Sequence, residues 1–190
     1  MNKYIIILVS VLSLGLVSCD AWLNRQPDEP RTSENIFEKR TTTFQYLANV
    51  YTWINNETDP SGQNNIFTPS SDECSVSFGN RWFRLFNNGT WQVSSNPSSF
   101  LSKNYSLYWK GIREASYFME NVHRCPELSD QEVKEWVAEA RFLRAYYYFC
   151  LMRMWGPVPI LGESPVDYSS EEVRDIDRNT WDECVNWVCD

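Results

Sequence analysis

The sequence predicts an all-α fold with long irregular loops, and three observations support this fold class. Apolar residues recur every three or four positions in three segments, which is the spacing of a buried helical face. Two segments begin with a capping box, in which a Ser or Thr and a Glu three residues later satisfy free amides at a helix start. The longest segment also lacks Gly and Pro until Gly156-Pro157, a typical helix stop.

The chain begins with the features of an exported lipoprotein. Lys3 gives a positive start, and residues 4–17 form an uncharged run that is shorter than the ~20 residues needed to span a bilayer. The run ends in LVSC at residues 16–19, which reads as a lipobox. We therefore expect residues 1–18 to be a signal peptide and Cys19 to be lipidated, because several acyl chains anchor a protein firmly. The alternative is an ordinary signal peptide with Cys19 as a plain cysteine.

Residues 19–34 contain Pro27 and Pro30 and predict an extended, lipidated tether. The first helix is expected at residues 35–55, with Thr41 and Thr42 as candidate caps. Polar residues at 55–56 and a Pro-Ser-Gly turn at 60–62 would end it. Its predicted core face consists of Phe44, Leu47, Ala48, Tyr51 and Ile54.

Residues 57–99 are rich in Ser, Asn, Gly and Pro, show no sustained period and carry scattered aromatic residues. A loop of this length in a compact domain is usually functional or disordered, and the aromatic residues argue against disorder. Flat aromatic rings and amide side chains suit the C–H faces and hydroxyls of sugars. The ligand-binding candidates are Trp82, Phe83, Trp91, Asn80, Asn87 and Asn88. The alternative is that the aromatic residues clamp the loop onto the helices.

Two further helices are expected at 105–124 and 130–155, joined by a short turn as a helical hairpin. The first would bury one face, made of Tyr105, Tyr108, Trp109, Ile112, Ala115, Met119 and Val122. The second begins with a capping box at Ser129 and Glu132, and Trp136 and Leu143 should be buried in it. Aromatic residues on several of its sides predict neighbours on more than one side. After a loop at 161–179, a second capping box at Thr180 and Glu183 starts a final helix.

The longest helix carries a family resemblance. Its run AEARFLRAYYYF at 138–149, followed by WGPVP at 155–159, resembles the signature helix of the SusD/RagB family. The run WKGIREA at 109–115 resembles a second signature, in which Asn commonly follows where this chain has Ser116. The run CDAWL at 19–23 resembles the start of mature members, which often have two acidic residues after the Cys rather than Asp20 alone.

The resemblance implies a tetratricopeptide-like array of helical hairpins in a nutrient-binding outer-membrane lipoprotein. Such a protein would capture an oligosaccharide at the cell surface and deliver it to a SusC-like TonB-dependent transporter, without being an enzyme. Family members are several hundred residues longer, so residues 35–190 are expected to be a C-terminally truncated helical domain. Two alternatives stay open: a peptide- or protein-binding helical module and a surface glycosidase. The sequence does not specify which glycan is bound.

Charge and composition argue against other classes. A net charge of −8 without a Lys/Arg cluster disfavours nucleic-acid binding. His123 is the only histidine, so a catalytic triad or a His-based metal site lacks its parts. Asp72-Glu73 is the most suggestive carboxylate pair, and a role in a turn is favoured over a calcium site or catalysis. We therefore expect no catalytic residue, metal or cofactor.

Five cysteines remain besides Cys19, namely Cys74, Cys125, Cys150, Cys184 and Cys189. An odd number leaves at least one free, and Cys150 is expected to pack as a small apolar residue. Cys184 and Cys189 lie ~140° apart around a helix and should not pair. Glu139, Arg141 and Arg144 are expected to form ion pairs or caps within the helical stack, with anion binding as the alternative.

Overall fold

The computed structural model describes residues 35–56, 67–73, 84–92, 98–166, 170–171 and 175–190. The chain divides into two compact units, Met1–Ile36 and Phe37–Asp190, and the second contains every described helix. The predicted signal peptide, Cys19 and the tether lie outside the described residues, as do Cys74, Asn80, Trp82 and Phe83. No described helix is both long and apolar enough to cross a membrane.

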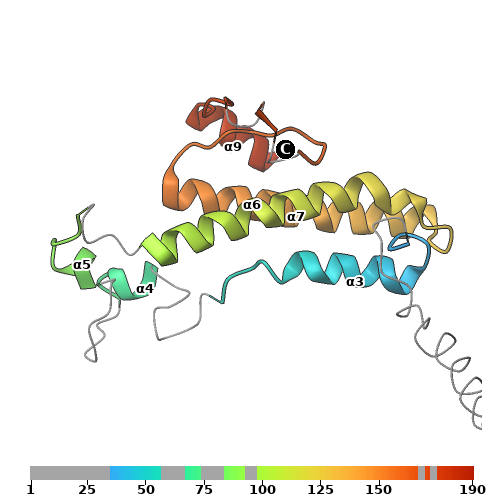
Figure 1. Ribbon diagram of the computed structural model, residues 1–190, viewed down its shortest axis with the longest axis horizontal. Coiled ribbons are helices and arrows are strands. Elements are labelled where there is room, and N and C mark those ends of the chain that lie inside the picture. Colours follow the sequence, from blue (N-terminus) through green and yellow to red (C-terminus); the bar gives the residue numbers. More distant parts are fainter. Residues whose placement is uncertain (1–34, 57–66, 74–83, 93–97, 167–169, 172–174) are drawn as a thin grey trace, which may run out of the picture. The chain divides into compact units, whose positions relative to one another are not determined.

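Helices are the only regular elements in the part of the chain that the structure describes (Figure 1). They are α3 (Arg40–Tyr51), α4 (Phe67–Ser70), α5 (Arg84–Asn87), α6 (Ser98–Asn121), a 3-10 turn (Val122–Arg124), α7 (Asp130–Trp155) and α9 (Trp181–Cys189). The predicted all-α character is confirmed in these segments. The 57–99 region was predicted to be irregular, and its described parts contain the two short helices α4 and α5.

The hairpin of α6 and α7 is the centre of the fold, as predicted (Figure 1). The bounds of α7 agree with the expectation, because the Ser129 hydroxyl accepts from the Glu132 amide and the Glu132 carboxylate accepts from the Ser129 amide. At its other end, Gly156 has φ +75° and terminates the helix. In contrast, α6 begins at Ser98, seven residues before the predicted start at 105. The Ser-rich stretch before residue 105 was predicted to be a loop, although Ser is also favoured where helices begin.

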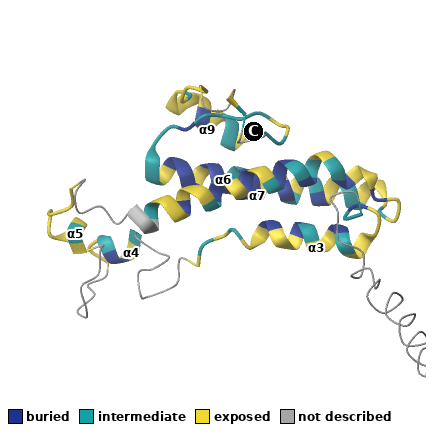
Figure 2. Cartoon of the chain, in the orientation of Figure 1, coloured by how far each residue is buried: buried dark blue, intermediate teal, exposed yellow. Residues whose placement is uncertain are grey.

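The hairpin core consists of buried residues of α6 and α7, which Figure 2 colours dark blue. These are chiefly Tyr108, Ile112 and Ala115 from α6 and Leu143, Tyr147, Cys150 and Leu151 from α7. Gly111 permits the close approach, because a β-carbon there would lie 2.7 Å from the Tyr147 ring. Trp136 and Leu143 are buried, as predicted. On α6, Phe118 is fully buried whereas Met119 is only partly buried, and Tyr105 is exposed.

Helix α3 is shorter than the predicted 35–55, because it begins at Arg40 and ends at Tyr51, and its buried face also differs from the prediction. Thr43, Leu47 and Val50 are buried against the hairpin, so only Leu47 of the predicted face is in the core. Thr43 can occupy a core position because its hydroxyl donates to the Lys39 carbonyl at 2.9 Å. The exposed members of the predicted face are Phe44, Ala48, Tyr51 and Ile54.

Two of those exposed aromatic residues still contact α7 from its rim. The Phe44 ring lies 5.7 Å from that of Trp136, and the Tyr51 hydroxyl donates to Glu139. The expected Thr cap of α3 is also wrong, because the N-cap is Lys39 and has no side-chain capping bond. The hydroxyl of Thr42 donates to the Lys39 carbonyl instead.

Helix α9 contacts α7 as well, which confirms that α7 has neighbours on more than one side. The capping box of Thr180 and Glu183 is present. Cys184 is buried and its thiol donates to the Val158 carbonyl at 3.3 Å. Cys150 is fully buried, as predicted, and the four described cysteines, Cys125, Cys150, Cys184 and Cys189, are unpaired. Two α7 aromatic residues remain exposed, Phe142 by 67% and Phe149 by 46%.

Candidate ligand-binding site

Half of the predicted ligand contacts are described by the structure. Asn87, Asn88 and Trp91 lie in and after α5, whereas Asn80, Trp82 and Phe83 are outside the described residues. The local structure around α5 decides how the three described side chains are presented. It is built from a short helix, a tight reversal and an aromatic pair.

A Schellman motif ends α5 and reverses the chain. The Gly89 amide donates to the Phe86 carbonyl at 3.0 Å, and the Thr90 amide donates to the Leu85 carbonyl at 2.9 Å. These are the two bonds of that motif, and they require a left-handed residue after the helix. Gly89 provides it with φ +64°, and no atom of the described residues lies within 4 Å of the place where its β-carbon would be. The sequence therefore returns Trp91 toward the helix that it has just left.

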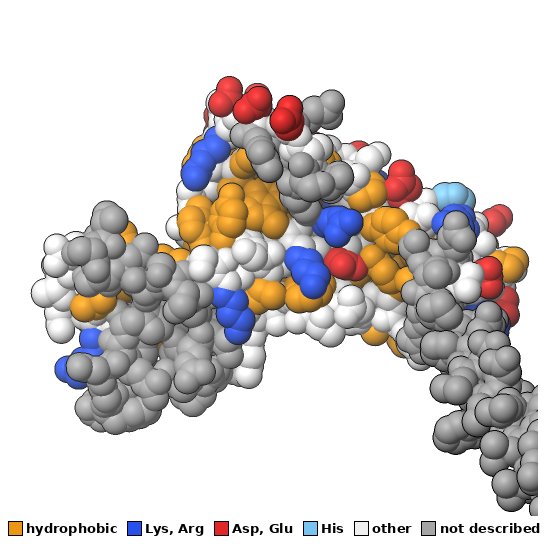
Figure 3. All heavy atoms as spheres, viewed as in Figure 1, with side chains coloured by type: hydrophobic (Ala, Val, Ile, Leu, Met, Phe, Trp, Pro, Cys, Tyr) orange, Lys and Arg blue, Asp and Glu red, His pale blue; other side chains and the backbone are white. Residues whose placement is uncertain are grey.

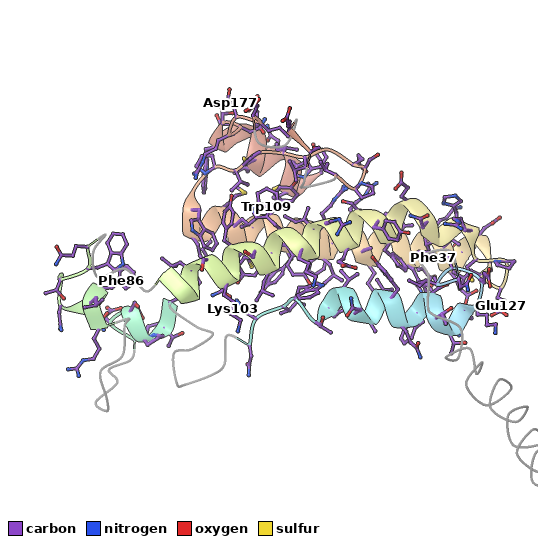
Figure 4. All side chains as sticks on the ribbon, viewed as in Figure 1. Phe37, Phe86, Lys103, Trp109, Glu127 and Asp177 are labelled. Carbon is purple, nitrogen blue, oxygen red and sulfur yellow. The ribbon has the colours of Figure 1, made fainter. Side chains whose placement is uncertain are left out.

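The reversal stacks Trp91 on Phe86. The two ring centroids are 5.7 Å apart and the ring planes differ by 15°. Trp91 is 40% exposed and Phe86 is 36% exposed, so this pair, the aromatic platform, remains accessible to solvent. Phe86, labelled on α5 in Figure 4, was not among the predicted contacts. A stacked pair is stiff, and it can offer a flat apolar surface to a ligand.

Polar side chains lie next to the platform. Asn87 donates its side-chain amide to the Pro69 carbonyl at 2.9 Å, which joins α5 to α4 and leaves its side-chain oxygen as the remaining acceptor. Asn88 is exposed. Helix α4 is joined to the hairpin in turn, because the Arg153 guanidinium of α7 lies 3.8 Å from the centroid of the Phe67 ring. The described half of the predicted site is therefore tied to α7.

A second concave region lies between α6 and the segment that follows α7. This cavity, which we call the α6 groove, has a volume of about 520 Å³. Its lining comprises Tyr105, Ser106, Trp109, Lys110, Arg113, Pro159 and Leu161. Figure 3 shows hydrophobic side chains gathered over this part of α6 with Lys and Arg side chains beside them, and Trp109 is labelled there in Figure 4.

Edge-to-face aromatic contacts fix the walls of the α6 groove. Tyr105 packs on Trp155 with centroids 5.2 Å apart, and Trp109 packs on Tyr148 at 5.9 Å. The Leu161 amide donates to the Tyr148 hydroxyl at 3.1 Å, which holds the segment after α7 in place. Burial raises the pKa of Tyr148, so its hydroxyl keeps its proton.

Sequence reasoning missed the α6 groove as a site. Tyr105 and Trp109 have the spacing of a helical face and were assigned to the core. The signal that distinguishes them is the presence of Lys110 and Arg113 beside two aromatic residues on the same helix. Pro159 and Leu161 come from a segment about fifty residues later, and a single sequence does not show that they lie opposite.

The remaining polar candidates have structural roles or are exposed. Buried Arg144 forms an ion pair with Glu163 at 3.2 Å and also donates to the Ser116 hydroxyl, which agrees with the expected ion pairing in the stack. A cavity of about 410 Å³ beside α9 includes both Arg144 and Glu163 in its lining. Asp72, Glu73 and His123 are exposed, and the described residues contain no group of His, Cys, Asp and Glu that could hold a metal ion.

Comparisons with known proteins agree with this architecture. A family model described as SusD-like, starch-binding and associating with the outer membrane matches residues 21–189. The crystal structure of a SusD-like protein from Bacteroides fragilis aligns with a TM-score of 0.62 at 18% identity, covering 83% of this chain and 29% of that one. At this identity the likeness concerns the fold, and it confirms the predicted helical, tetratricopeptide-like class. This chain thus spans less than a third of the length of that structure. No curated protein matches it.

Proposed function

Because the chain belongs to the SusD-like family of starch-binding, outer-membrane-associated proteins, we propose that it is a surface-exposed lipoprotein that binds an oligosaccharide. In this proposal it delivers the glycan to a SusC-like TonB-dependent transporter. It acts by binding rather than by catalysis. The family match supports glycan binding and association with the outer membrane. The structure adds a candidate surface for contact with the glycan.

The observation that carries the binding proposal is the aromatic platform. A sugar ring presents C–H groups on its faces and hydroxyls at its edge. Trp91 and Phe86 offer a flat apolar surface for the first, and the exposed Asn88 side chain offers both donors and an acceptor for the second. Holding Trp91 in place costs little entropy compared with a long flexible side chain, because it has few rotatable bonds and is already stacked.

Replacing Trp91 tests this role. Trp91→Ala should weaken glycan binding in calorimetry about tenfold, equivalent to ~1.4 kcal/mol, because the ligand loses an aromatic contact. The melting temperature should hardly change, since Trp91 is 40% exposed. Trp181→Ala is the matched control, because Trp181 is a 50% exposed tryptophan at the start of α9. If Trp91→Ala lowers the melting temperature and leaves affinity unaltered, the pair only clamps its loop.

Membrane anchoring of the protein, and with it delivery of the glycan to a transporter, would involve residues that the structure does not describe. The lipobox at 16–19 supports lipidation of Cys19 and the following residues supply a tether. Cys19→Ala should abolish labelling by radioactive palmitate and shift the protein from the membrane to the soluble fraction. Unchanged labelling would refute the anchor. Recovery of a TonB-dependent barrel with the lipidated, full-length protein would support delivery, and its absence from such a purification would count against it.

A further inference from the structure

The charged side chains that line the α6 groove are both cationic. They are Lys110 and Arg113, and no carboxylate contributes to the lining among the described residues. This local excess of positive charge contrasts with the net charge of −8 for the whole chain. Both side chains are exposed, so a ligand in the groove can reach them.

Within the described residues, neither of these two cations belongs to an ion pair. The ion pairs found within the described segments join Arg40 to Glu132 and Arg144 to Glu163, and neither involves the groove. The Lys110 ammonium lies 4.2 Å from the centroid of the Trp53 ring, a contact that orients the charge without cancelling it. The cavity beside α9 differs, because its lining includes both members of the Arg144–Glu163 pair.

The other side of the groove is apolar. Tyr105, Trp109, Pro159 and Leu161 line it, and the two rings are held by their edge-to-face contacts. The volume of about 520 Å³ falls within the ~300–1,000 Å³ of ordinary small-molecule sites. A ligand that fits must therefore combine an apolar face with an anionic edge. Guanidinium and ammonium groups both bind carboxylates, and the guanidinium does so through two parallel hydrogen bonds.

We propose that the α6 groove binds a uronic acid residue of an acidic oligosaccharide. The C–H face of the sugar lies against Tyr105 and Trp109, and its carboxylate binds Arg113 and Lys110. The Ser106 hydroxyl forms hydrogen bonds with the ring hydroxyls of the sugar. This inference depends on the proposed function for one assumption, namely that the ligand is a glycan. It adds a second site, which shares no residue with the aromatic platform, and it names the ligand's charge.

An uncharged analogue separates the carboxylate from the rest of the sugar. We suggest calorimetry of the protein with trigalacturonate, with the same trimer after its carboxyls are reduced to alcohols, and with a neutral glucose trimer. The acidic trimer should bind about tenfold more tightly than the reduced one, because the charge-assisted bonds are lost. Its affinity should also fall as salt is raised. Equal affinities for the acidic and reduced trimers, or no binding of the acidic trimer, would overturn the proposal.

Variants then assign the charge to named residues. Arg113→Gln and Lys110→Gln should each weaken trigalacturonate binding about tenfold, and Arg113→Lys should be intermediate because it keeps the charge and loses the paired bonds. Lys103→Gln is the matched control, since Lys103 is an exposed cation on the same helix and does not line the groove. All three side chains are exposed, so melting temperatures should change little. Affinity that is insensitive to Arg113→Gln and Lys110→Gln refutes the assignment.

Two further outcomes distinguish this inference from the proposed function. If a short poly-glutamate peptide binds more tightly than trigalacturonate and depends on Arg113, the groove is a peptide site and the uronate proposal fails. If neutral glycans bind through Trp91 while trigalacturonate does not bind, the proposed function stands and the inference alone falls.

Discussion

Gly111→Ala should destabilise the protein, although the change places a better helix former in α6. The new β-carbon would lie 2.7 Å from both Cδ2 and Cε2 of Tyr147 and 3.0 Å from Cζ. Non-bonded carbon atoms prefer separations of ~3.5–4.0 Å. The ring cannot retreat easily, because Tyr147 is fully buried, stacks on Tyr108 and donates its hydroxyl to the Val50 carbonyl.

The magnitude follows from two opposing effects. Gly to Ala in a helix interior stabilises by ~1 kcal/mol through propensity alone. Overpacking a buried site typically costs ~1–3 kcal/mol, and displacing Tyr147 also weakens its bond to the Val50 carbonyl, which is worth ~1 kcal/mol. The overpacking and the weakened bond together exceed the propensity gain, so we expect the free energy of unfolding to fall by roughly 1–3 kcal/mol.

Urea denaturation followed by far-ultraviolet circular dichroism measures this difference. Ser102→Ala is the control, because Ser102 is exposed on the same helix and its replacement should be neutral or slightly stabilising. The double variant Gly111→Ala/Tyr147→Leu should cost less than the sum of the single changes, because leucine removes the outer ring atoms that the new methyl meets. A Gly111→Ala protein that is ~1 kcal/mol more stable would show that α6 and α7 are not in close contact there.

Two other predictions concern the platform and the pH dependence of stability. Gly89→Ala should reduce glycan affinity in calorimetry, because a left-handed conformation costs ~1–2 kcal/mol for a residue with a β-carbon. The chain reversal that stacks Trp91 on Phe86 would then be strained. Unchanged affinity would mean that this turn does not position the Trp91 ring for the ligand. Partial desolvation of its hydroxyl, then the hydrogen bond to Glu139 and the charge of that carboxylate, raise the pKa of Tyr51 to about 12. The folded state therefore holds this proton more tightly than the unfolded state, so the contribution is present below pH ~10 and is lost as pH rises toward ~12. The melting-temperature difference between the protein and Tyr51→Phe should shrink over that interval, and a constant difference would contradict the assignment.

The parts of the fold that could be predicted from sequence are those with local signals. The capping box at Ser129 and the stop at Gly156 determine the bounds of α7 within the chain itself. The face of α3 could not be assigned in the same way. Phe44 looks like a core residue and Thr43 does not, but Thr43 satisfies its hydroxyl on the preceding turn and Phe44 packs from the rim. Hydrophobicity alone cannot rank such neighbours.

The candidate sites also combine features that the sequence indicates with features that only the folded chain reveals. Scattered aromatic and amide residues indicated the region of Trp91, Asn87 and Asn88, but the partner of Trp91 depends on the turn that Gly89 makes. The α6 groove depends on packing between segments distant in sequence. Its aromatic residues have the spacing of a core face, and only the contacts of the folded chain reveal that they line a cavity.

Calorimetric titration with neutral oligosaccharides, acidic oligosaccharides and peptides of matched length tests the proposed function most directly. The family membership and the aromatic platform predict saturable binding of at least one oligosaccharide class, with no peptide binding more tightly. Trp91→Ala should weaken the binding of neutral oligosaccharides. Binding of peptides in preference to every oligosaccharide would contradict the glycan-binding proposal and favour a peptide-binding helical module instead.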